Sequence, residues 1–109
     1  MKGNFDGQGL MFFLGVGTYK GSFSNGQIEG TGRFDYQNGA IYEGDWRDNR
    51  KHGIGKWIDT DRLSLYDGEW ENDQKHGRGA FIEGSSLTNE GVWKEDNLVE
   101  MTNFQNQQP

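Results

Sequence analysis

Hydrophobic and polar residues alternate in short blocks along most of this chain. In the block Tyr42–Trp46, the two aromatic residues and Gly44 occupy one side of the alternation and two acidic residues occupy the other. A period of two is typical of a β-strand, because successive side chains point to opposite faces of a sheet. The alternation therefore predicts short strands with aromatic rings and glycines on one face and charged residues on the opposite face.

The blocks form an internal repeat. A first block, Tyr-x-Gly-x-aromatic, starts at residues 19, 42 and 66 and, with asparagine in place of tyrosine, at residue 89, so neighbouring copies are 23, 24 and 23 residues apart. A regular period of this length predicts a repeat architecture in which each unit packs on its neighbours. A second block, Gly-x-Gly-x followed by a large apolar residue, occurs at Gly7–Met11, Gly30–Phe34, Gly53–Trp57 and Gly77–Phe81.

Polar residues that favour tight turns separate the blocks. Turns at Ser24–Gly26, Arg47–Arg50 and Glu71–Gln74 join each first block to the second block after it. Asn and Asp tolerate the left-handed backbone that such turns need. Asn38-Gly39, a strong signal for a two-residue turn, joins one hairpin to the next. The sequence therefore predicts an all-β, single-layer antiparallel meander of tandem β-hairpins with about eight short strands.

The regular glycines need a physical reason, because glycine normally weakens a strand. We expect each glycine on the aromatic face to leave room for a ring from a neighbouring strand to lie against its backbone. Only 31% of the residues are hydrophobic but 14% are aromatic, and rings bury a large area per residue. Contacts between glycines and rings are thus expected to replace a thick core.

The repeat also divides the chain. We expect a repeat domain at 1–98 and a polar C-terminal tail at 99–109, whose glutamine and asparagine content favours disorder. An open meander leaves two edge strands, expected near Gly7–Met11 and Gly91–Lys94, and exposed edges invite pairing. Within the domain we expect a half repeat at 3–13, full repeats at 19–34, 42–57 and 66–81, and a half repeat at 89–94.

Charge and cysteine content narrow the function. The net charge of −6 at pH 7 disfavours nucleic acid and anionic membranes as partners, because both are bound through basic patches. The chain has no cysteine, which excludes disulfides, thiolate metal ligands and cysteine nucleophiles. We recognise no signal peptide and no run of the roughly 20 apolar residues that a spanning helix needs, so we expect a cytoplasmic location.

Two copies carry the most complete motif, Tyr-x-Gly-x-Trp followed by His-Gly-x-Gly-x-aromatic. They run from Tyr42 to Trp57 and from Tyr66 to Phe81. This motif resembles the membrane occupation and recognition nexus (MORN) repeat over roughly residues 3 to 94. The first full copy departs from the motif, because Glu29 stands at the histidine position.

The resemblance implies a single elongated, twisted sheet of MORN hairpins that is groove-shaped on one side, binds other proteins and is not an enzyme. It also implies a scaffold or adaptor in a larger cytoskeletal or ciliary (axonemal) assembly. Two alternatives remain open. One is a regulatory repeat fragment of a larger enzyme. The other is a phosphoinositide-binding module at a membrane surface, for which the densest basic cluster is Arg47, Arg50, Lys51 and His52.

The aromatic face is the candidate partner-binding site. A single layer cannot bury every ring, exposed apolar patches mark interaction sites, and Tyr and Trp are common anchors there. We expect a groove that receives a helix or an extended strand of a partner protein, against the alternative that the rings serve only intramolecular packing. Edge-strand pairing, including a homodimer, is a second route to assembly. The expected groove residues are Tyr19, Phe23, Tyr42, Trp46, Tyr66, Trp70 and Trp93.

No catalytic residue, metal ligand or cofactor is expected. His52 and His76 lie one repeat apart, whereas zinc needs three or four converging ligands, so we assign them a structural role in turns and packing. Paired carboxylates perform glycoside chemistry only when they flank a cleft. We expect the carboxylates opposite the rings to form a charged solvated surface: Glu43, Asp45, Asp67 and Glu69.

Overall fold

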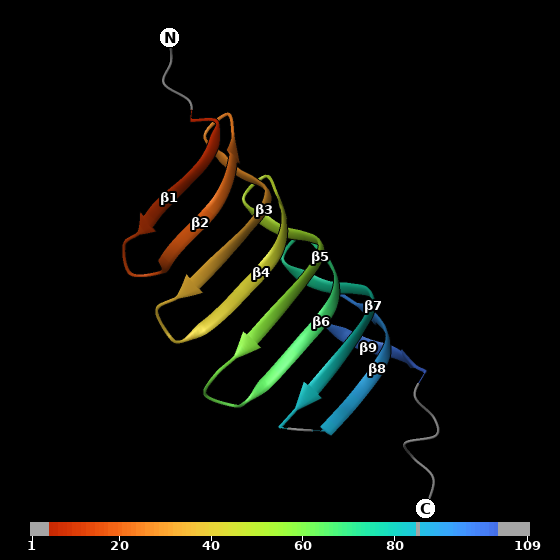
Figure 1. Cartoon of the computed structure of the whole chain (residues 1–109). Helices are drawn as coiled ribbons and strands as arrows, with labels where there is room; N and C mark the ends of the chain where they lie inside the picture. Colours follow the sequence, from red (N-terminus) through yellow and green to blue (C-terminus); the bar gives the residue numbers. More distant parts are fainter. Residues whose placement is uncertain (1–4, 85, 103–109) are drawn as a thin grey trace, which may run out of the picture.

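The described residues form a single open sheet of nine antiparallel strands in sequence order (Figure 1). The structure is a computed structural model that describes residues 5–84 and 86–102. The predicted all-β antiparallel meander is confirmed. The strands are β1 (Gly7–Phe13), β2 (Gly17–Ser24), β3 (Gln27–Tyr36), β4 (Ala40–Arg47), β5 (Arg50–Asp59), β6 (Ser64–Glu71), β7 (Gln74–Glu83), β8 (Ser86–Lys94) and β9 (Asn97–Met101).

The ninth strand corrects the prediction at the C-terminal edge. β9 pairs with β8 from Gly91↔Met101 to Lys94↔Asn97, so the edge expected at Gly91–Lys94 is wrong and β9 is the edge strand. The sequence signal was absent because β9 has no glycine or aromatic residue. Residues 103–109 of the predicted tail lie outside the described residues.

The turns within hairpins lie at the predicted positions, and each has two residues. In the β4–β5 turn, for example, Asp48 and Asn49 have φ of 51° and 67°. Positive φ at both central residues characterises the type I′ turn, whose twist matches that of the flanking strands. The turn at Asn38-Gly39 differs from the prediction, because three residues connect β3 to β4 and only Gly39 among them has positive φ (98°).

In each of the three full repeats a β-bulge interrupts the first block between its glycine and its second aromatic residue, as at Gly44/Trp46. The residue at the bulge uses its side chain to bond the facing strand, and Asp45 Oδ2 accepts the Ile54 N–H at 2.9 Å. Bulges bend a strand and increase its twist. Register shifts also lie at Gly21/Phe23 and Gly68/Trp70.

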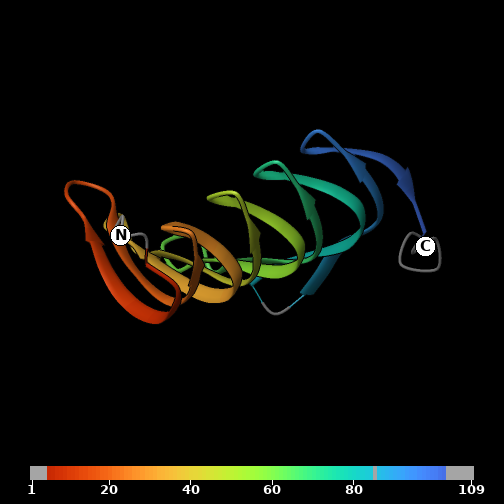
Figure 2. The same ribbon diagram turned by 90° about the horizontal axis from the view of Figure 1, so that it is seen from above.

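The sheet is long and curled. Its principal extents are 63 × 25 × 18 Å, and Figure 2 shows each hairpin bending over in the same direction along the array. The elongated shape implied by the resemblance is confirmed. Within the described residues no helix has the length and hydrophobicity needed to cross a membrane.

Candidate protein-binding groove

A continuous ladder of seven rings covers one face of the sheet. Neighbouring rings meet edge to face, with centroids 5.0–5.5 Å apart and interplanar angles of 82–89°. This T-shaped geometry is favoured by the ring quadrupoles and contributes about 0.5–1.5 kcal/mol per pair beyond area burial. In order of contact, this ring ladder consists of Phe23, Tyr19, Trp46, Tyr42, Trp70, Tyr66 and Trp93.

Glycines make the ladder possible, as the sequence predicted. A Cβ atom built on Gly55 would clash with the Tyr42 ring and hydroxyl. The same relation joins Gly32 to Tyr19 and Gly79 to Tyr66. Each tyrosine ring thus lies over the glycine of the next strand, and this contact fixes the first block of a repeat against the second block of the same repeat.

The polar atoms of these rings are all used within the chain. The Tyr42 hydroxyl donates to the Asp45 carbonyl at 2.9 Å, and Trp70 Nε1–H donates to the Gly55 carbonyl at 3.0 Å. Tyr19 and Tyr66 donate equivalent hydroxyl bonds to backbone carbonyls, and Trp46 and Trp93 donate equivalent Nε1–H bonds. Burial raises the pKa of Tyr66 to about 12, and nearby Glu69 adds to that shift. The ladder is therefore a satisfied hydrophobic core one ring thick.

The seven residues of the ring ladder are the same seven residues that were predicted to contact a partner. Their exposed fractions run from 0% for Tyr19 and Tyr42 to 7% for Trp93. Such side chains have little surface left to offer a ligand. A direct role for them in binding stays a prediction, and their observed role is to form the floor of the ring face.

A second row of rings lies above this floor and is only half-buried. Phe13, Tyr36, Trp57 and Phe81 pack against the ladder residues without being covered by them. The Tyr36 ring lies 4.4 Å from the Phe34 ring and 5.1 Å from the Trp57 ring, measured between centroids. We call these four residues the rim. Burial, reinforced by the charge of Asp73, raises the pKa of Tyr36 to about 12, so its hydroxyl stays protonated at neutral pH.

Two adjoining hollows lie between the rim and the hairpin turns. The first, of about 400 Å³, is lined on its apolar side by Phe13, Val16 and Tyr36, among others. The second, of about 270 Å³, lies over Trp57 and Trp70. Lys51 and Asp73 border both hollows, which makes them one continuous depression. We call this depression the ring-face groove.

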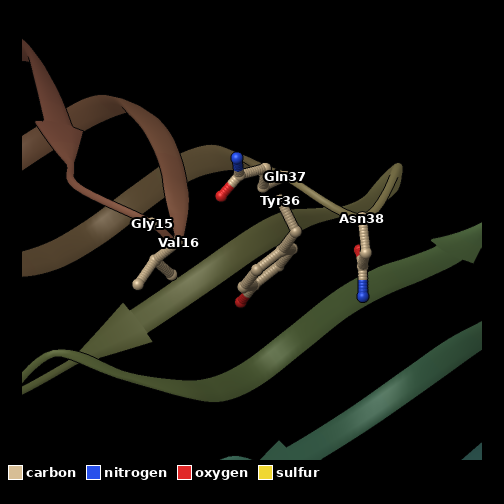
Figure 3. A pocket seen from close by; sticks show the side chains of 5 residues that line it. All are labelled: Gly15, Val16, Tyr36, Gln37 and Asn38. Atoms are coloured by element: carbon tan, nitrogen blue, oxygen red, sulfur yellow. The ribbon is translucent and has the colours of Figure 1, made fainter.

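The groove extends toward the loops between hairpins. A shallow hollow of about 400 Å³ is lined by Gly15, Val16, Tyr36, Gln37 and Asn38. In Figure 3, Val16, Tyr36 and Asn38 project to the same side of the ribbon, whereas Gln37 points the other way. The Gln37 N–H donates to the Val16 carbonyl at 2.8 Å, which fixes the two loops side by side.

Two lysines on this face, Lys51 and Lys75, make cation–π contacts with the rings. Lys51 Nζ lies 5.2–5.8 Å from the ring centroids of Trp57, Trp70 and Tyr42. Asp73 Oδ1 is 3.4 Å from the same nitrogen and 2.8 Å from the Lys51 backbone nitrogen. Cation–π attraction and the ion pair hold the Lys51 side chain against the rings. The turn of one hairpin is thereby latched onto the strand before it.

The latch is a repeating feature that the sequence analysis missed. Asn49 bonds both backbone groups of Ile28, and Asp96 bonds those of Lys75. The available signal was the second turn residue of each hairpin, which is Asn or Asp in three of them. Their bonding role is not visible in the local sequence, because their partners lie 21 or 22 residues away.

The remaining candidates take structural positions. Asp45 and Glu69 bond backbone N–H groups at the bulges, so the carboxylates opposite the rings do more than form a solvated surface. His76 Nε2 lies 3.2 Å from Glu71 Oε1 on the surface, and His52 is half-buried. Among the described residues, His, Asp and Glu do not form a group of three or more able to hold a metal ion.

A family model agrees with this geometry. The model described as the MORN repeat matches residues 19–41, 42–63 and 66–82, more than half of the chain. These matches fall on the three full repeats, each a hairpin with its ring-ladder tyrosine and its bulge. No curated protein matches the chain.

Proposed function

Because the chain belongs to the MORN repeat family, whose repeats are non-catalytic protein- or membrane-binding modules, we propose that it is a scaffold or adaptor without catalytic activity of its own. Its ring-face groove holds a segment of another protein. The observation that carries this proposal is the half-buried rim above a floor that is already packed. The rim rings pack against the buried cluster without being buried themselves, and Phe13, Tyr36 and Trp57 remain partly open beside two hollows.

The groove suits an extended or helical segment. Exposed Tyr and Trp rings that border a depression are typical anchors for a partner's apolar side chains. The two hollows adjoin at Lys51 and Asp73, so successive side chains of one segment can enter them in turn. The floor does not have to rearrange, because every polar atom described for the ladder is already bonded within the chain.

Charge along the groove defines which segment fits. The positions equivalent to Phe13 in successive repeats are Tyr36, Asp59 and Glu83. This row changes from aromatic at the β1 end to acidic at the β7 end, and Lys51 and Lys75 are paired with Asp73 and Asp96. The proposed segment is therefore apolar at one end and basic at the other, and the net charge of −6 favours its approach.

Membrane lipid is the second candidate and fits less well. The expected basic cluster includes Lys51, but that lysine is held between rings and Asp73. Elsewhere Arg33 pairs with Asp35 at 2.9 Å and Arg62 lies 3.9 Å from Asp59. Paired cations contribute little to phosphate binding. A cytoplasmic, cytoskeletal or ciliary assembly remains the setting we propose for the scaffold, and a role as a regulatory part of a larger enzyme is the alternative.

Photo-crosslinking tests the groove directly. A photoreactive amino acid replaces Tyr36 on the rim or, as a matched control, Ile54, which is 56% exposed on the opposite face. After irradiation in native lysate without detergent, the adducts are identified by mass spectrometry. We expect one defined protein at Tyr36 and not at Ile54. The same adducts at both positions would refute the groove.

A binding series then measures the contribution of the rim. With the identified partner, Tyr36→Ala and Trp57→Ala should each weaken binding by at least tenfold, as expected for anchor residues. Ile54→Ala should bind as the unchanged chain does. Flotation with vesicles that contain phosphoinositides tests the second candidate, and binding lost on mutation of Arg47 and Arg50 but kept in Tyr36→Ala would favour lipid.

A further inference from the structure

The first strand differs from every other strand of the sheet. β1, Gly7–Phe13, contains no Asp, Glu, Lys, Arg or His, whereas each of β2 to β9 contains at least one of them. β1 is also an edge, hydrogen-bonded within the described residues to β2 alone. Natural sheets normally protect an edge with charges, proline or a bulge. This edge has none of these devices, since its register with β2 is unbroken.

Large apolar side chains on and beside β1 are open to solvent. Leu10 is 59% exposed and Phe12 75% exposed on the face opposite the ring ladder. In the adjoining turn, Leu14 is fully exposed and Val16 is 49% exposed. On that opposite face, Leu10, Phe12 and the adjoining Leu14 form an apolar patch beside backbone groups that pair with no other described strand, and we call this patch the β1 edge; Met11 and Val16 lie on the ring-face side.

We propose that two copies of the chain pair through their β1 edges, antiparallel and related by a two-fold axis, to form one continuous sheet. A neutral edge allows this although each copy carries a net charge of −6, because no like charges meet at the seam. A two-fold axis normal to the sheet turns the second β1 antiparallel to the first. It also makes the apolar edge complementary to itself, because every contact from residue i of one copy to residue j of the other occurs twice.

Strand direction disfavours the simplest alternative, head-to-tail stacking. In a nine-stranded antiparallel meander, β1 and β9 run in the same direction. A copy added by translation would therefore place its β1 parallel to β9, and parallel pairs are slightly less stable than antiparallel ones. β9 is also shorter, with five residues against seven, and carries Glu100. The β1 edges close on each other instead of building a filament.

The exposed area indicates a reversible dimer. At 75% exposure, Phe12 offers about 150 Å². The whole patch offers on the order of 400 Å² per copy, or about 800 Å² for the pair, below the roughly 1,200 Å² of a standard interface. Backbone hydrogen bonds along β1 add to this contact. We expect a dissociation constant on the order of micromolar.

Such a dimer would present two grooves on the same side. The two-fold axis normal to the sheet keeps both ring faces pointing in one direction. A partner with two suitable segments would then be held at both grooves, and binding of the second segment gains from effective concentration. This consequence requires the proposed groove function, whereas the dimer itself does not.

Sedimentation equilibrium tests the dimer on the unmodified chain. The apparent mass should rise from 12.4 kDa toward twice that value across the micromolar range. Leu10→Lys and Phe12→Lys should each weaken association at least tenfold, because they bring like charges together at the seam. Ile54→Lys, a control with similar exposure far from β1, should leave it unchanged. A monomer at every concentration up to about 1 mM, well above the micromolar range expected for so small an interface, would overturn the proposal.

Disulfide trapping locates the seam independently. The chain has no cysteine, so a single Leu10→Cys variant can form only an intermolecular disulfide. Under mild oxidation it should dimerise at least tenfold faster than Ile54→Cys. Circular dichroism confirms that each variant is folded, which exposed positions should permit. Equal rates for the two variants, or association that survives Phe12→Lys, would contradict pairing through β1. Photo-crosslinks at Tyr36 test the groove separately.

Discussion

The contact between Gly55 and Tyr42 gives the sharpest test of how this fold is held together. Replacing Gly55 with alanine adds a single methyl group to β5. That methyl would clash with the Tyr42 ring and hydroxyl. The ring is completely buried and lies between Trp46 and Trp70, with centroid distances of 5.0 and 5.4 Å. It cannot move aside without disturbing both neighbours.

The expected cost follows from these contacts. Overpacking of this kind costs about 1–3 kcal/mol. If the ring shifts, the 2.9 Å hydrogen bond from the Tyr42 hydroxyl to the Asp45 carbonyl is lost as well, at about 1 kcal/mol. We therefore expect Gly55→Ala to lower the free energy of unfolding by about 2–4 kcal/mol. Out of a typical total of about 5–15 kcal/mol, this leaves the domain folded but much weakened.

A double-mutant cycle isolates the contact. Urea denaturation is measured for Gly55→Ala, for Tyr42→Leu and for the double variant. Tyr42→Leu replaces the ring with a shorter aliphatic side chain. Because the added methyl then has room, the substitution should cost little in the Tyr42→Leu background, giving a coupling of about 2 kcal/mol. Lys56→Ala, on the exposed opposite face, should change stability by less than about 0.5 kcal/mol. If Gly55→Ala costs the same in both backgrounds, the glycine does not act by accommodating the ring.

Two further predictions concern polar groups. Asp45→Ala should destabilise the chain by about 1 kcal/mol in urea denaturation, because the Ile54 N–H loses its acceptor. Asp45→Ser should recover most of this loss, since Ser22 Oγ bonds the equivalent Thr31 N–H at 3.1 Å in the first repeat; no difference between the two variants would refute a hydrogen-bonding role. The four tyrosines all have a raised pKa, about 12 for Tyr36 and Tyr66, so the fold favours their protonated form and stability should fall as pH rises from 10 toward 12. Tyrosinate absorbance should therefore show no step near pH 10 in the folded chain, and a normal step there would contradict the burial.

Most of the fold could be predicted because its signals are local and repeated. Alternation gave the strand faces, and the Asn and Asp residues gave the hairpin turns. The glycines on the aromatic face, such as Gly55, indicated where a ring would lie. β9 could not be predicted, since Leu98 contacts the core without a neighbouring glycine or ring in the sequence to mark it. That strand is defined by its pairing with β8, which is a tertiary contact.

The candidate site was predicted only in part. The structure contains the predicted ring face, whereas its role in binding stays a prediction, and the seven residues expected to bind form the buried ladder. The recurring tyrosine of each first block is a residue that the fold itself buries, as the complete burial of Tyr19 and Tyr42 shows. Burial in a single-layer sheet depends on how far the strands curl. The bulges produce that curl, and no local pattern indicated them.

The positions that differ between repeats therefore carry the specificity of the proposed groove. The floor needs the same glycine and ring in each hairpin, so selection on stability keeps those residues alike within the array. We expect no such constraint on the row Phe13, Tyr36, Asp59 and Glu83, because none of these residues belongs to the buried cluster. Its change from aromatic to acidic can follow the partner instead. In a repeat protein of this kind, regularity identifies the residues that fold the chain, and departures from regularity identify the surface that distinguishes one partner from another.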